Sequence, residues 1–414
     1  MTVYARFLAL INMGFFDALF VRKPTPQAFA AQFIEAAKRR GFDAALSYNA
    51  DEFRLEYGGN AVFNLHHAYR AYCSSDKASR DTALQGFVAT LCSSGKAAPE
   101  RLSDARAMLR PLIRGRGVLE DVRLHQLRTA GREAAFAPAW RAFGDDCATL
   151  LALDYPESTS TLMSGPVKSW GITLDDALTI ACDNLRDITT DSFVEVARGV
   201  YRGDWRDGYD ASRALLPDLL HRAPVHGFPV FMIPTRDVLL VTSDKDDGGL
   251  ARMVELSREA AQTGRPVSPF MYCYDEGLRR FTPRQAQVAQ RLAQLALRYR
   301  KDDYDAQKTA LDRLHKQEGR DVFVANYLLY GAKDEAGEMF SAATWTAGVE
   351  SLLPQADRIV LVRPESGETR IVPWQQIASL VGGLLEEQPM YPVRYRTRGF
   401  PDVGQYAAVT IGEP

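Results

Sequence analysis

The densest group of polar residues lies at 204–213, where the sequence reads DWRDGYDASR. Asp207, Asp210 and Arg213 follow one another at intervals of three residues. In one interpretation, the two carboxylates hold a cation or activate water beside a helix N-terminus, where an anionic substrate is stabilised. With Asp237 further along the chain, these residues form the candidate catalytic site of a hydrolase or a ligand-binding enzyme.

A structural interpretation of the same residues has more weight. Gly208 is suited to a tight turn, and Asp210 or Ser212 is suited to capping a helix over 211–221. Arg213 is then expected to pair with a buried carboxylate. Because capping alone accounts for most of these residue types, the sequence favours structure over chemistry here.

The sequence predicts no bound metal and no cofactor. His66 and His67 are adjacent, so on a helix they point about 100° apart and do not share one metal. The loop that begins at Asp244 resembles a calcium loop, but Gly248 stands where a ligand is needed, and a turn capped by aspartate is favoured. The chain contains none of the common nucleotide, zinc-protease or nucleophile-elbow motifs.

Short runs around the polar group are similar to the bacterial YtpQ-like family over about residues 25–285. These runs are DGYDASR at 207–213, NLR at 184–186, and Pro234 with DVL at 237–239. The family is described as a domain of unknown function. The resemblance therefore implies an intracellular bacterial protein and supplies no catalytic residue, and it does not extend to 286–414.

The elements that must position these residues alternate between helices and hairpin-joined strands. This alternation predicts an α+β protein with mainly antiparallel sheets and helices on one face. Thr25 and Thr173 are predicted helix caps, and Asp176 is expected to reach back to Thr173. The expected helices are 27–40, 65–72, 81–91, 173–186, 211–221, 250–263, 283–317 and 375–385, and the expected strands include 193–197, 228–233, 238–242, 270–274 and 322–329.

A chain of 414 residues is too long for one core, so two or three domains are expected. Trp345, Leu352 and Leu353 are predicted to anchor the core of the last one. The predicted division is a small α+β domain at 25–95, a central α+β domain at 105–282, a charged helical linker at 283–318 and a C-terminal α+β domain at 319–414.

The N-terminal apolar segment is interrupted by Asn12, Gly14 and Asp17, so it is not expected to span a membrane. Met13 resembles a natural chain start, and removal of 1–12 is expected to leave the fold intact. On a helix, one apolar face offers a weak contact with a membrane or a partner, although packing on the protein's own core is favoured. That face consists of Phe15, Phe16, Leu19 and Phe20.

The functional hypotheses can be ranked from the composition. The 50 basic and 52 acidic residues are interleaved, and the net charge is −2. The five cysteines are scattered, which fits a reducing compartment. The first hypothesis is a non-catalytic interaction or scaffold protein of the bacterial cytoplasm, whose partner is a protein. The hydrolase or ligand-binding enzyme is second, and nucleic-acid binding is third. This last one depends on two arginine clusters, at Arg110, Arg114 and Arg116 and at Arg394, Arg396 and Arg398.

Overall fold

The computed structural model describes residues 23–58, 61–93, 97–131, 137–156, 158–331 and 339–408. The chain divides into two compact units: unit 1 is Met1–Ala98 with Asp154–Ser160, and unit 2 is Pro99–Leu153 with Thr161–Pro414. Helices combine with several mainly antiparallel sheets, so the predicted α+β class is confirmed. The expectations for the Met13 start and the apolar face at 15–20 lie outside the described residues.

In its described residues, unit 1 packs three helices with a small antiparallel sheet. The side chain of Thr25 accepts a hydrogen bond from the Ala28 backbone N–H at 3.1 Å, so the predicted cap is confirmed. Phe29, Phe33 and Leu55 are fully buried in its core. The elements are α2 (Pro26–Arg39), β1 (Ser47–Asn49), β2 (Arg54–Tyr57), β3 (Ala61–Asn64), α3 (His66–Ser74) and α4 (Arg80–Ser93).

Unit 2 begins with a sheet in which β6 pairs with β4 and β5, both antiparallel. Helix α7 packs on β4, and its start carries the predicted capping box between Thr173 and Asp176. The elements are α5 (Leu102–Ala105), β4 (Leu109–Gly115), α6 (Gly117–Ala130), β5 (Arg141–Phe143), β6 (Cys147–Tyr155), β7 (Ser158–Thr161) and α7 (Leu174–Asp187).

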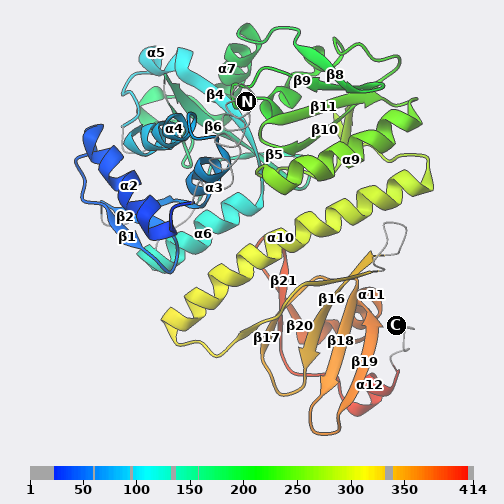
Figure 1. Ribbon diagram of the computed structural model, residues 1–414. Helices are drawn as coiled ribbons and strands as arrows, with labels where there is room; N and C mark the ends of the chain where they lie inside the picture. Colours follow the sequence, from blue (N-terminus) through cyan, green and yellow to red (C-terminus); the bar gives the residue numbers. More distant parts are fainter. Residues whose placement is uncertain are drawn as a thin grey trace, which may run out of the picture. The chain divides into compact units, whose positions relative to one another are not determined.

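A six-stranded antiparallel sheet forms the centre of unit 2, in the order β13-β12-β10-β11-β9-β8. Helix α9 (Asp247–Thr263) covers one face (Figure 1), and the Asp246 side chain caps it by accepting from the Gly249 N–H. The predicted capping turn is thus confirmed. The strands are β8 (Phe193–Ala197), β9 (Val200–Gly203), β10 (Pro229–Thr235), β11 (Val238–Ser243), β12 (Met271–Tyr274) and β13 (Leu278–Arg280).

The continuous helix expected at 211–221 is wrong. The segment forms a short 3₁₀ helix, η3 (Ala211–Leu215), and then a single turn, α8 (Pro217–Leu220). Pro217 has no N–H to donate, and its ring clashes with the carbonyl group of the preceding turn. The backbone therefore leaves helical geometry at Leu216, with φ −111° and ψ 84°.

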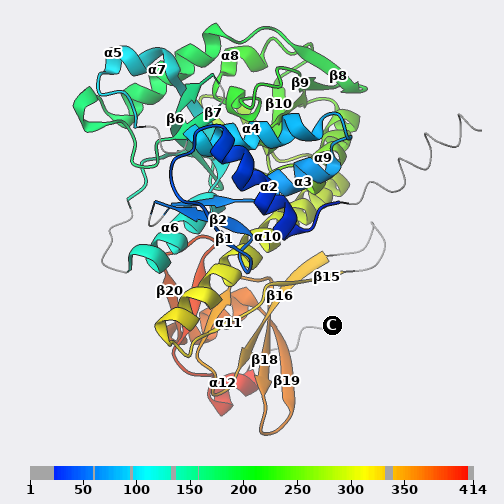
Figure 2. The same ribbon diagram turned by 60° about the vertical axis from the view of Figure 1, so that its left-hand side comes forward.

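Helix α10 (Ala286–Glu318) is one uninterrupted helix of 33 residues. Its first half packs on the face of the central sheet that α9 also covers, through Val288, Leu292 and Leu295. This confirms the docking that was predicted from the apolar stripe. Its second half packs on the C-terminal strands, and Tyr304 belongs to their core. Figures 1 and 2 both show α10 running across these strands. None of the helices in the described ranges is long and apolar enough to cross a bilayer.

The C-terminal part contains two four-stranded sheets, β14-β17-β21-β20 and β15-β16-β18-β19, with two parallel pairs, β14 with β17 and β16 with β18. Trp345 and Leu353 are fully buried, as predicted, whereas the strand expected at 322–329 is split into two. The four-part domain division stays a prediction. The elements are β14 (Phe323–Val324), β15 (Leu328–Gly331), β16 (Met339–Thr346), β17 (Ser351–Pro354), β18 (Arg358–Arg363), β19 (Glu368–Pro373), α11 (Trp374–Val381), β20 (Leu385–Gln388), β21 (Arg394–Thr397) and α12 (Val403–Ala408).

Candidate functional site

Two residues of the predicted site form a two-pronged ion pair. The Nη1 and Nη2 atoms of Arg213 donate to the two carboxylate oxygens of Asp207 at 2.8 and 2.6 Å. Arg213 is fully buried, its Nε donates to Thr189, and its guanidinium group lies 4.4 Å from the centre of the Trp205 ring. The expected pairing of Arg213 with a carboxylate is confirmed, but that carboxylate, Asp207, is exposed and not buried as expected. Because Nε, Nη1 and Nη2 of Arg213 all donate hydrogen bonds to other side chains, this arginine has a structural role.

The predicted capping role of Asp210 is wrong. Asp210 already has helical backbone angles, φ −52° and ψ −53°, whereas a capping residue usually has extended ones from which its side chain reaches the next N–H groups. Its Oδ1 accepts from the backbone N–H of Arg206 at 3.3 Å, and its Oδ2 has no hydrogen-bond partner among the described residues. Ser212 does not cap either, because its hydroxyl group accepts from the N–H of Ile113.

Asp237 is exposed in the turn between β10 and β11. The turn contacts the polar group through the backbone, where the N–H of Ala211 donates to the carbonyl oxygen of Arg236 at 3.1 Å. Neither of the two cavities described below is lined by Asp207, Asp210, Arg213 or Asp237. The structure therefore brings Asp207 and Arg213 together, but none of the four predicted residues lines either cavity.

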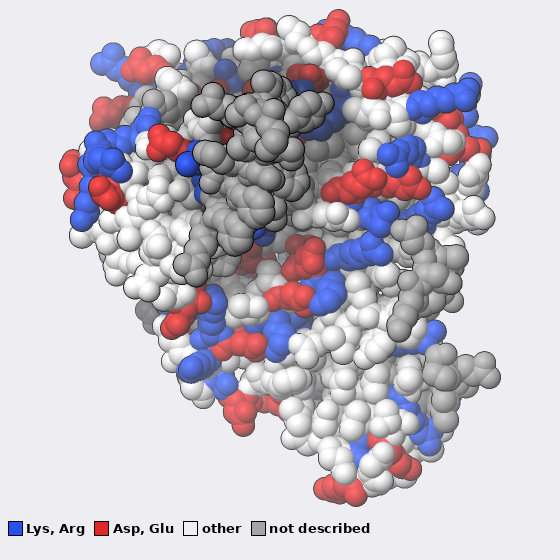
Figure 3. Space-filling view, viewed as in Figure 1, with Lys and Arg blue, Asp and Glu red and all other residues white. Residues whose placement is uncertain are grey.

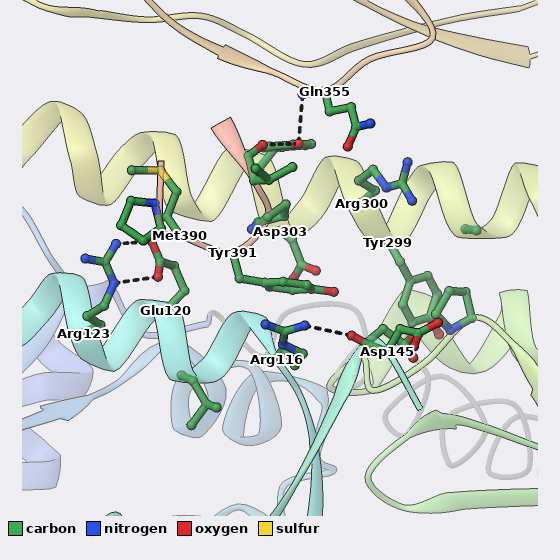
Figure 4. A pocket seen from close by; sticks show the side chains of 18 of the residues that line it. Arg116, Glu120, Arg123, Asp145, Tyr299, Arg300, Asp303, Gln355, Met390 and Tyr391 are labelled. Carbon is green, nitrogen blue, oxygen red and sulfur yellow. Dashed lines mark hydrogen bonds and ion pairs between the residues drawn. The ribbon is translucent and has the colours of Figure 1, made fainter. Parts of the chain in front are cut away.

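The larger cavity, about 660 Å³, lies in unit 2 between α6, α10 and the segment 387–393 that joins β20 to β21 (Figure 4). We name it the α6–α10 cavity. Its volume is within the range of small-molecule binding sites. A smaller cavity of about 160 Å³ lies beside Leu124 and Leu314 and shares Arg123 and Met390 with the larger one.

Asp303 projects from α10 into the α6–α10 cavity beside Tyr391 (Figure 4). Burial, together with the nearby carboxylates of Asp121, Asp302 and Asp146, raises the pKa of Asp303 to about 7, and Arg300 opposes this shift. Among the described residues, its carboxyl group forms no hydrogen bond or ion pair. Asp303 is thus partly protonated near neutral pH and has unused bonding capacity.

Two of the other acids at this cavity pair with arginines, and a third, Glu387, is exposed to solvent. Glu120 receives two hydrogen bonds from Arg123, at 2.6 and 2.8 Å (Figure 4). Asp145 lies 3.4 Å from the guanidinium group of Arg280. These pairs set Asp303 apart as the carboxyl group that a ligand would satisfy.

Asp146 belongs to a buried hydrogen-bonded group at the base of the cavity. Its Oδ1 accepts from the hydroxyl group of Tyr272 at 2.5 Å, and its Oδ2 accepts from Ser268 at 2.7 Å. Burial raises the pKa of Asp146, and these two hydrogen bonds oppose the shift. Both oxygens are occupied, so the group fixes the floor of the cavity.

Aromatic rings and Arg116 form one part of the cavity wall, which also includes Arg123, Arg280 and Arg300. The guanidinium group of Arg116 lies 5.3 Å from the centre of the Trp140 ring and 4.5 Å from that of Tyr391. Its Nη1 donates to the carbonyl oxygen of Asp145 at 3.0 Å. The hydroxyl group of Tyr299 donates to the backbone of Pro234 at 2.7 Å, which holds this ring in place. The wall is therefore pre-organised by cation–π contacts and hydrogen bonds.

Sequence analysis missed this cavity. Its lining comes from segments that are far apart in the chain, and α6 was not among the expected helices. The one local signal was charge: Asp302 and Asp303 lie within α10 between its buried tyrosines Tyr299 and Tyr304. Comparisons with protein-family models, curated proteins and solved structures gave no match. The YtpQ-like resemblance stays a prediction.

Proposed function

We propose that this protein binds a small molecule in the α6–α10 cavity, and that the ligand carries a basic nitrogen beside Asp303. The observation that carries the proposal is the unpartnered carboxyl group of Asp303 with a pKa raised to about 7. A carboxyl group that the fold leaves without a partner in a cavity of this size is a candidate ligand-binding group.

The charges around Asp303 favour a cation over an anion. Asp121, Asp302 and Asp146 together raise the pKa of Asp303, so the potential at its oxygens is negative. A protonated amine or amidine relieves that repulsion and forms charge-assisted hydrogen bonds with the ionised carboxylate. An anionic group at the same place would add a further like charge.

The wall favours a ligand with a flat ring. Trp140, Tyr299 and Tyr391 present aromatic surface. Aromatic side chains stack on planar groups and attract cations through the ring face. A ring that bears a basic nitrogen satisfies both the carboxyl group and this wall.

Benzamidine, with benzamide as its neutral counterpart and benzoate as its anionic one, tests the proposal by isothermal titration calorimetry. At pH 8 benzamidine should bind, and benzamide and benzoate should bind at least tenfold more weakly. Between pH 8 and pH 6 its affinity should fall, because Asp303 takes up a proton and loses its charge.

Asp303→Asn should remove both the binding of benzamidine and its dependence on pH. Glu387→Gln is the matched control, because Glu387 is an exposed carboxylate on the same cavity and should be dispensable. Equal binding of benzamide and benzamidine, or unchanged binding by Asp303→Asn, contradicts the assignment of Asp303.

Three other functions remain as hypotheses. A pKa near 7 also suits a general acid or base, so a hydrolase acting through Asp303 ranks second. The interaction or scaffold protein of the bacterial cytoplasm stays a prediction. Nucleic-acid binding ranks last, because Lys and Arg are interspersed with Asp and Glu on the face in Figure 3. In addition, Arg396 and Arg398 pair with Glu350 and Glu386.

A further inference from the structure

Three arginines from separate segments meet at one end of the central sheet. Arg114 lies at the end of β4, Arg236 in the β10–β11 turn and Arg265 in the connection from α9 to β12. The N–H of Arg236 donates to the carbonyl oxygen of Arg265 at 3.2 Å. β4 passes the same connection at Gly115, where an added Cβ would lie 3.1 Å from the carbonyl oxygen of Val267. We name these three residues the arginine triad.

The arginine triad has little compensating charge, because the charge that acts on all three members is that of one exposed carboxylate, Asp237. None of its three guanidinium groups forms an ion pair with a carboxylate in the part of the chain that the structure describes, and Arg114 donates only to the adjacent carbonyl oxygen of Ile113, at 2.8 Å. Burial lowers the pKa of Arg236, and the charges of Arg114 and Arg265 lower it further. Asp237 opposes this shift but is exposed to solvent.

A fourth arginine reaches the same turn. Nη2 of Arg202 donates to the carbonyl oxygen of Asp237 at 3.3 Å, and its buried Nε has no hydrogen-bond partner among the described residues. Arginine stays protonated at neutral pH, so the cluster keeps a surplus of positive charge and free donors. Such a surplus is stabilised when an anion binds.

We propose that the arginine triad binds a compact oxyanion with at least two negative charges, of the phosphate-monoester or pyrophosphate type. Each planar guanidinium group can donate two parallel N–H hydrogen bonds to the oxygens of such an anion. None of the three residues lines the α6–α10 cavity, so this site is separate from the proposed amine site.

A compact ligand fits better than an extended polyanion. The second arginine cluster in the sequence offers no continuation of the positive charge. Its first member, Arg394, is fully buried, and Arg396 and Arg398 are paired with glutamates. A nucleic-acid strand would need a continuous row of free cations.

The test is calorimetric titration of the full chain with inorganic pyrophosphate at constant ionic strength. Pyrophosphate should bind, and Arg236→Gln should weaken binding at least tenfold. Arg252→Gln should bind as the parent does, because Arg252 lies on the surface of α9 and pairs with Glu255. The melting temperature of ligand-free Arg236→Gln should equal or exceed that of the parent, since the change removes a repelled charge.

Three outcomes would overturn the inference. They are no binding of pyrophosphate at millimolar concentration, equal binding by Arg236→Gln, and a large fall in the melting temperature of ligand-free Arg236→Gln, which would assign the arginine a structural role. Tighter binding of a single-stranded oligonucleotide than of pyrophosphate would overturn the choice of a compact ligand. None of these results depends on benzamidine binding or on Asp303.

Discussion

The carboxyl group of Asp303 on α10 lies directly against Gly117 at the start of α6. A Cβ atom added at residue 117 would lie 2.5 Å from Oδ1 of Asp303, which is closer than such atoms approach in proteins. Glycine at 117 thus makes room for the group on which the proposed function depends.

Stability should depend on the ionisation of Asp303. Because the fold raises the pKa of Asp303 to about 7, the protonated form stabilises the native state, and this contribution is complete below about pH 4. It is lost as the pH rises toward and through 7. The free energy of unfolding of Asp303→Asn, minus that of the parent, should therefore be about 1–3 kcal/mol higher at pH 8 than at pH 4. Denaturant melts at the two values measure this, and a pH-independent difference would contradict the shifted pKa.

Gly117→Ala should displace the Asp303 carboxyl group and weaken benzamidine binding. Alanine in place of an unhindered helical glycine normally stabilises by about 0.5–1 kcal/mol. Gly86 on α4 is such a glycine, with nothing within 4 Å of the added Cβ, so Gly86→Ala should show that gain in a denaturant melt. Gly117→Ala should show none of it. Equal gains and unchanged binding would mean that Asp303 moves aside freely.

Asp210 and Arg213 should behave differently from each other. Asp210 is buried, its pKa is raised by burial, and its side chain does not cap η3, so Asp210→Asn should be neutral or stabilising at pH 7. Arg213→Ala removes a fully buried side chain with its hydrogen bonds to Asp207 and Thr189, and should cost about 2–5 kcal/mol. Melts that rank the two variants in the opposite order would contradict these assignments.

Arg394 should tolerate substitution far less than Arg396 does. Arg394 is fully buried, and its guanidinium group donates to Gln307 and to the carbonyl oxygens of Ala325, Leu352 and Tyr304. Lysine has no planar fork, so Arg394→Lys leaves several of these acceptors unsatisfied and should cost about 2–5 kcal/mol.

Arg396→Lys is the matched control. It keeps a surface pairing with Glu350 and should cost less than about 1 kcal/mol. Urea denaturation of both variants gives the comparison. Similar losses would mean that the buried hydrogen bonds of Arg394 contribute little.

The sequence by itself determined the elements whose causes are local. Thr25 and Thr173 begin helices because their side chains reach N–H groups three residues ahead, and the apolar stripe of α10 required a neighbouring surface to cover it. Four strands of the central sheet, β8, β10, β11 and β12, followed from apolar runs bounded by turn residues, whereas β9 and β13 were not expected. The continuous helix expected at 211–221 does not form, because Pro217 breaks it.

The tertiary structure alone decided which charges lack partners. Asp303 and Arg394 look like ordinary surface residues in the sequence, since charged residues are usually exposed. Only the packing of α10 against α6 and against the C-terminal strands buries the first without a partner and the second among carbonyl oxygens. The cost of burying a charge depends on every group within a few ångströms, and those groups come from distant segments whose meeting no local pattern encodes.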